Sequence, residues 1–201
     1  VSPDYSYLDN IRGPSDGDLG NYTKFTYDQV QDGFPWCAPV SPNVNQVARW
    51  NKGLEGDPTD DKASYVCGEK EIDHLRTIEG RNFIAVFNLN DDLYEIRSDA
   101  RGVADGGVVN SSKHSRFLKS ISLYKKVPGW SASDYGTNGA IPVKTVHFEY
   151  DYSLCPQTPN SVATNKGKVT LKKVWFTYGA SDRGVTTPYV FIYDHNPNYD
   201  M

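Results

Sequence analysis

Three polar residues at alternate positions are the first candidates for chemistry in this sequence. His147, Glu149 and Asp151 are spaced two apart, so in a β-strand their side chains project from one face. An imidazole and two carboxylates on one face could bind a metal ion or act as an acid–base pair. The same alternation is typical of the solvent-facing side of a half-buried sheet, and no second histidine lies at metal-ligand spacing. We favour the solvent-face interpretation.

A second candidate is a calcium site near the start of the chain. Asp16 and Asp18 alternate within the run Asp16–Gly20, as the first ligands of a calcium-binding loop do. A complete loop needs further carboxylates and a distal bidentate Glu, which are missing, so turn capping by Asp is the simpler interpretation. Ca²⁺ nevertheless remains the one cofactor worth testing, with Asp16 and Asp18 as its ligands, and otherwise we expect none.

Tryptophans provide the most reasonable ligand-binding hypothesis. Trp36, Trp50 and Trp130 lie in turn-rich or irregular stretches, where exposed aromatic rings could stack on sugars and form a carbohydrate-binding platform. Trp175 lies in a strand-like run and is interpreted as structural. A lectin-like module that uses the three loop tryptophans is thus the alternative function.

Motifs and charge exclude several other classes. The sequence has no P-loop, no Gly-rich dinucleotide turn and no Ser/His/Asp or Cys/His set, so we expect no enzyme. A hydrolase with a carboxylate pair is the weakest hypothesis. The formal net charge of −4 argues against a nucleic-acid partner. No apolar run approaches the roughly 20 residues that a membrane-spanning helix requires.

Cysteine spacing leaves the redox state open. The three cysteines are Cys37, Cys67 and Cys155. They form no CxxC pair and no zinc-site spacing. At most one internal disulfide is possible, and the spacing does not give its connectivity. We favour free cysteines that behave as small, buried apolar residues.

The elements that must position these residues are mainly β-strands. Runs rich in β-branched and aromatic residues predict strands, and short loops without helices between them indicate an antiparallel meander. The predicted strands are 24–30, 72–78, 83–89, 93–97, 116–127, 141–154, 167–179 and 188–194.

Three stretches are less clear. Residues 69–78 could also form a helix, because Ile72, Leu75 and Ile78 recur at helical spacing. Residues 43–54 could form one or two helical turns, and residues 101–115 are predicted to be a loop. In the run 141–154, Val146 and Phe148 share one face and His147 and Glu149 the other, which predicts one buried and one wetter side.

The fold class that follows is mainly β, an antiparallel meander or sandwich-like sheet. We expect an irregular, turn-rich segment over residues 1–62 and an antiparallel β domain over residues 63–201, together forming one folding unit. The chain begins with Val1 rather than Met, so we expect a processed chain or part of a longer protein.

Several phrases together resemble an internal segment of very large exported or surface proteins of Bacteroidetes. The phrases span 15–25, 68–72, 83–87, 143–155, 167–179, 188–191 and 196–199. The later strands are loosely similar to the β-rich shells of Rhs-repeat and SpvB-like toxin proteins. The resemblance implies an extracellular or cell-surface location and export through the type IX secretion system. It assigns no catalytic or ligand residues.

The function expected from these observations is a non-catalytic structural β module, a scaffold, a shell or an export cargo. Its partners would be the remaining segments of a larger parent polypeptide and the outer-membrane export machinery. A scaffold of this kind should carry apolar surfaces or unpaired strand edges where the rest of the parent docks.

Overall fold

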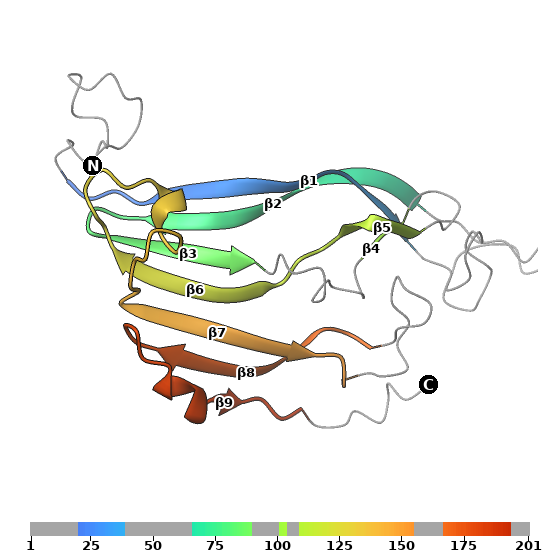
Figure 1. The fold of residues 1–201 in the computed structure, drawn as a ribbon. Helices are drawn as coiled ribbons and strands as arrows, with labels where there is room; N and C mark the ends of the chain where they lie inside the picture. The colour runs from blue at the N-terminus through green and yellow to red at the C-terminus, as the bar shows by residue number, and fades with distance from the viewer. Residues whose placement is uncertain (1–19, 39–65, 90–100, 104–108, 155–166, 194–201) are drawn as a thin grey trace, which may run out of the picture.

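The fold is taken from a computed structural model that describes residues 20–38, 66–89, 101–103, 109–154 and 167–193 (Figure 1). The predicted strand at 93–97 and the predicted helical turns at 43–54 lie outside the described residues. So do Asp16, Asp18, Trp50 and Cys155.

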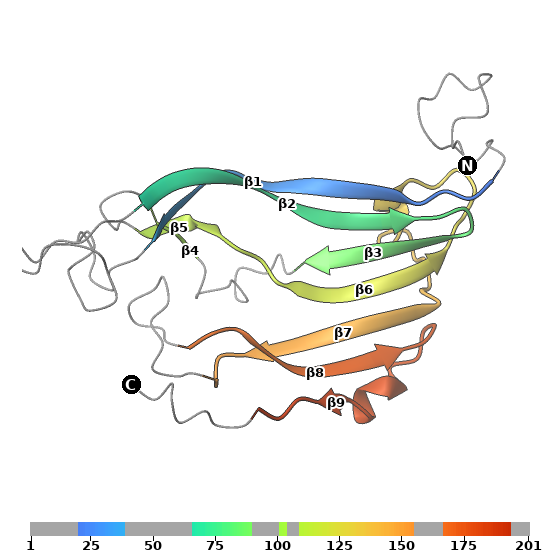
Figure 2. The same ribbon diagram turned by 180° about the vertical axis from the view of Figure 1, so that it is seen from behind.

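Seven strands form one antiparallel sheet, in the order β1-β2-β3-β6-β7-β8-β9. Each strand pairs with the next main-sheet strand along the chain, as Figures 1 and 2 show from opposite sides. The mainly-β, antiparallel meander predicted from the sequence is confirmed. The strands are β1 Lys24–Ala38, β2 Val66–Glu79, β3 Phe83–Leu89, β6 Leu118–Lys125, β7 Lys144–Asp151, β8 Thr170–Thr177 and β9 Tyr189–Val190.

The ambiguous stretch at 69–78 is a strand. β2 and β3 form a hairpin in which Ile78 lies opposite Ala85. The Gly80 N–H donates to the Phe83 carbonyl at 2.9 Å and closes the turn. The helical spacing of apolar residues in β2 is overridden because the strand pairs along both edges, with β1 and with β3.

β1 is longer than the sequence predicts. It continues past Val30 to Ala38 and includes Pro35, a residue that lacks the N–H needed in a central strand. The strand tolerates this proline because β1 lies at the edge of the sheet. Its pairing with β2 contains three register shifts, between Thr26 and Phe34.

The predicted loop at 101–115 is wrong in part. β4 (Arg101–Val103) and β5 (Val109–His114) form a small antiparallel sheet of their own that contacts β1. Gly102 is buried against the ring of Pro35, and a Cβ at this position would lie 3.0 Å from it. The glycine that suggested a loop thus permits close packing of the small sheet on β1.

The loop between β6 and β7 covers one face of the main sheet. It contains the short 3₁₀ helix η1 (Ala132–Asp134), and it places Tyr135 against Ile84, Val86 and Tyr124 to form the buried core. The Tyr135 hydroxyl accepts the Val127 N–H at 2.8 Å, which fastens the loop to the end of β6.

The cross-strand register assigns residues to the two faces of the sheet. We call the side under the Tyr135 loop the covered face. Its buried members are Thr77, Ile84, Val86, Ser122, Tyr124 and Thr145. We call the other side the open face, defined by Phe25, Ile78, Phe83, Ala85, Phe87, Ile121, Leu123, Lys125, Lys144, Val146, Phe148, Val174, Phe176 and Tyr189.

The two faces differ from the sequence-based expectation in one respect. The alternation along β7 is confirmed, but its most buried residue is Thr145, on the polar side, whereas Glu149 on that same side is exposed. Thr145 is 5% exposed, whereas Val146 and Phe148 are only half-buried. The reason is that the β6–β7 loop folds over the side that carries Thr145 (Figure 1), and in the view from behind no described element lies over β3, β6, β7 and β8 (Figure 2).

The described residues contain no helix long and apolar enough to cross a membrane.

Candidate functional site

The open face is the most unusual surface of the described chain. Twelve of its fourteen members are apolar or aromatic, and every member is half-buried or exposed. Phe25 is 52%, Phe83 47% and Tyr189 66% exposed. Antiparallel sheets with one solvated face normally place polar side chains there. A contiguous apolar surface of this kind marks an interaction site.

Two lysines give the open face its charge. Lys125 lies opposite Phe83, and Lys144 lies opposite Leu123, at one end of the strands. The Lys144 ammonium lies 4.1 Å from the ring centroid of Phe176 and 5.5 Å from that of Tyr178. This geometry is a cation–π contact, and it holds a positive charge beside the apolar surface.

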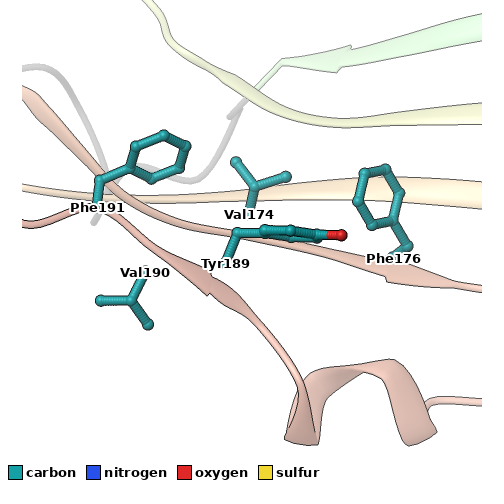
Figure 3. A pocket seen from close by; sticks show the side chains of 5 residues that line it. All are labelled: Val174, Phe176, Tyr189, Val190 and Phe191. Carbon is teal, nitrogen blue, oxygen red and sulfur yellow. The ribbon is translucent and has the colours of Figure 1, made fainter.

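A shallow groove of about 430 Å³ continues the open face onto the edge of the sheet (Figure 3). Val174 and Phe176 from β8, Tyr189 and Val190 from β9, and the following Phe191 line it. The Tyr189 and Phe176 rings meet edge to face, with centroids 6.0 Å apart. The lining lacks an acid, a base or a nucleophile other than the Tyr189 hydroxyl, so the groove suits an apolar side chain rather than a reaction.

His147 has a structural environment. Its ring stacks on Trp175 with centroids 5.1 Å apart and planes 7° apart, and Nε2 lies 2.9 Å from the Thr177 Oγ1. Burial lowers the pKa of His147, so the ring is neutral at pH 7.

Glu149 and Asp151 are each engaged with other residues. The Lys173 ammonium lies 2.8 Å from Glu149. Burial opposes ionisation of Asp151, but hydrogen bonds from Ser153 and the nearby Lys172 outweigh it and lower the pKa. His147, Glu149 and Asp151 therefore do not converge on one point. Among the described residues, no group of three or more His, Cys, Asp or Glu side chains is arranged to hold a metal ion.

The structure does not bring the described tryptophans together. Trp36 lies opposite Gly68 at the start of β2 and is half-buried over it. Trp130 packs beside the core at the other end of β2, with its ring 5.4 Å from Tyr135. Glu79 lies eleven positions after Gly68 in β2, which is on the order of 35 Å along a strand. These two tryptophans cannot contact one sugar.

Cys37 and Cys67 form a disulfide between β1 and β2. They are directly opposite in the register of the two strands. The interpretation that the cysteines are free thiols does not hold for this pair. The residues next to Cys37 and Cys67 in the sequence do not reveal this disulfide, because the two cysteines lie opposite each other only as a result of the register shifts within β1.

Sequence reasoning missed the open face as a site. Part of the signal was present: in the predicted strand 141–154 the apolar Val146 and Phe148 alternate with polar residues, whereas residues 83–87 are apolar at every position and 167–179 becomes apolar on both faces toward its end. The alternation was interpreted as evidence of burial. What a single sequence could not show is that the covering loop lies on the other side.

Comparisons with known proteins give no relative for this arrangement: no family model, curated protein or solved structure matches the chain. The class is therefore defined by the fold and the site alone, as an antiparallel β module with one open apolar face.

Proposed function

We propose that this chain is a non-catalytic structural β module of a larger secreted or cell-surface protein. Its open face packs against another β-sheet of that protein. The observation that carries the proposal is the row of half-buried and exposed apolar side chains across β3, β6, β7 and β8.

A second sheet is the occupant that fits this surface best. The open face is a pleated, twisted surface of aliphatic and aromatic side chains, and such surfaces pack face to face about 10 Å apart in β-sandwiches. Burial of these side chains removes apolar area from water, at about 25 cal/mol per Å². A small ligand would occupy only the groove beside β9.

Charge specifies the partner sheet further. Lys125 and Lys144 lie at one end of the open face, so a complementary sheet carries Asp or Glu opposite them. Lys or Arg at those positions of the partner would oppose docking, because like charges would meet. Complementary charges of this kind select among partners more than they add affinity.

The Cys37–Cys67 disulfide supports the extracellular part of the proposal. Disulfides form and persist in oxidising compartments and are rare in the cytosol.

Photo-crosslinking tests the proposal. A benzophenone amino acid replaces Phe148 on the open face or, as a control, Glu149 on the opposite face of the same strand. In the material isolated from its source, position 148 should crosslink to alternate residues of one segment of the same polypeptide, and position 149 should not. The native polypeptide should also exceed 22.5 kDa. A discrete 22.5 kDa monomer that gives no crosslinks from position 148 would contradict the proposal.

A further inference from the structure

The two edges of the main sheet differ in how they are protected. Edge strands invite pairing with other chains, and natural proteins block them with charges, bulges, prolines or covering elements. β1 has all four: it carries Asp28 and Asp32, three register shifts and Pro35, and the β4–β5 sheet contacts it. The opposite edge, formed by β9 and the residues after it, has none of these among the described residues.

We call Tyr189–Tyr193 the edge segment. All five residues are large and apolar or aromatic, and all are exposed: Tyr189 66%, Val190 57%, Phe191 39%, Ile192 89% and Tyr193 43%. The segment contains no charge and no proline. Exposed residues of this kind, at a sheet edge that no described strand pairs with, are a template for strand addition.

The backbone of the edge segment is oriented for such addition. The Phe191 N–H donates to the Lys172 carbonyl at 2.9 Å, toward β8. Successive residues of an extended chain direct their N–H and C=O groups to opposite sides. Val190, the last residue of β9, therefore directs its N–H and C=O outward, away from β8. Because β9 ends at Val190, the pairing proposed below requires Ile192 to continue this alternation. The 3₁₀ helix η2 ends at Thr186 and bounds this free edge on one side (Figure 1).

The order of side chains is symmetric about Phe191. The sequence reads aromatic, β-branched, aromatic, β-branched, aromatic. In an antiparallel pair with a two-fold axis at Phe191, Val190 lies opposite Ile192 of the second copy, and Phe191 lies opposite its own equivalent. Each Val190–Ile192 pair then exchanges two main-chain hydrogen bonds, and like types of side chain meet across the strands.

We propose that the edge segment pairs with the same segment of a second copy of this chain. An isologous interface requires a self-complementary patch, and the symmetric order of the edge segment provides one. Because the segment is uncharged, self-pairing brings no like charges together. The two-fold axis is perpendicular to the sheet, so the open faces of the two copies continue on the same side. This dimer does not depend on the proposed function of the open face.

Sedimentation velocity across a concentration series tests the pairing with two matched double variants. Both change the same two exposed positions, whose side chains do not contribute to the buried core. V190K/I192K places Lys opposite Lys across the two-fold axis, and V190K/I192E places Lys opposite Glu. Circular dichroism checks that both variants keep the fold.

The wild-type chain should form a species of twice 22.5 kDa. V190K/I192K should raise the dimer dissociation constant by roughly 100-fold or more, because like charges meet at two symmetric places, whereas V190K/I192E should still dimerise. A wild-type monomer at the highest soluble concentration would overturn the proposal. So would equal dimerisation of all three proteins, which would place the interface elsewhere, or loss of the dimer in both variants, which would exclude this register.

Discussion

Thr145 and Val146 are neighbours in β7, and the polar residue is the buried one. Thr145 is 5% exposed and donates to the Ser122 hydroxyl at 3.1 Å on the covered face. Val146 lies on the open face between Ile121 and Phe176. The buried core of the described fold therefore lies on the covered face of the sheet, and its uncovered apolar side chains lie on the open face.

The stability contributed by the two faces can be compared by truncating one valine on each of them. Val86 is 2% exposed in the core, and Val146 is half-buried on the open face. We expect Val86→Ala to lower the free energy of unfolding by about 2 kcal/mol, because it removes packed methyl groups and leaves a cavity. Val146→Ala should cost less than about 1 kcal/mol. Urea unfolding of the two variants gives both values. Equal losses would mean that the open face is already covered within this chain.

The β6–β7 loop should depend on one hydrogen bond. Tyr135→Phe keeps the buried ring but leaves the Val127 N–H without its acceptor at 2.8 Å. We expect a loss of about 0.5–1.5 kcal/mol, the net contribution of an ordinary hydrogen bond, because Val127 is 38% exposed and water can replace the lost acceptor. Native-state hydrogen exchange should show faster exchange at Val127. Tyr178→Phe, on a 59% exposed ring, is the control and should change neither quantity.

The disulfide should stabilise the pairing of β1 with β2. Cys37 and Cys67 are 30 residues apart, and closing a loop of that length in the unfolded chain is worth about 3.5 kcal/mol. The double variant Cys37→Ser, Cys67→Ser should lose stability by about that amount in thermal or urea unfolding. Reductant should destabilise the wild-type chain and have no effect on the variant. Alkylation of both thiols in the native, unreduced chain would show that the bond is absent.

Acid should weaken the fold in two steps. Burial holds the pKa of His147 below 6.5, and burial with the nearby Arg116 does the same for His74. The unfolded chain therefore binds more protons than the folded one as the pH falls below about 6.5, so stability that is present above this pH is lost on acidification. Hydrogen bonds from Ser131 lower the pKa of Asp134, so its contribution is lost only below about pH 3.8.

Urea unfolding between pH 8 and pH 5 checks the first step. His147→Gln should flatten the slope, because it removes one of the groups that take up protons on unfolding. An unchanged slope in this variant would show that burial does not hold the His147 imidazole neutral in the folded chain.

The antiparallel meander was predictable because its signal is local. Lys144–Asp151 alternates with period two, Phe83–Leu89 is a short apolar run rich in aromatic and β-branched residues, and turn residues follow both. The β4–β5 pair was not predictable, because its strands are short and Gly102 favours a loop until Pro35 packs against it. The site was half-predictable: the alternation identified the apolar side of β7, but which side a distant loop covers depends on tertiary contacts such as Tyr135 with Tyr124.

The candidate tryptophans show the same limit. Trp36 and Trp130 have similar irregular surroundings in the sequence, yet they lie at opposite ends of β2. Strand register, rather than composition, decides which side chains meet.

Hydroxyl-radical footprinting of the aromatic side chains tests the central claim most directly, because it needs no substitution. The labelling of Phe87, Phe148 and Phe176 on the open face is compared between the purified chain and the native material from its source. Tyr135, which is buried in the chain itself, serves as the internal reference. If another sheet docks on the open face, these three phenylalanines lose most of their labelling in the native material while Tyr135 is unchanged. Equal labelling of the three in both preparations would contradict the account.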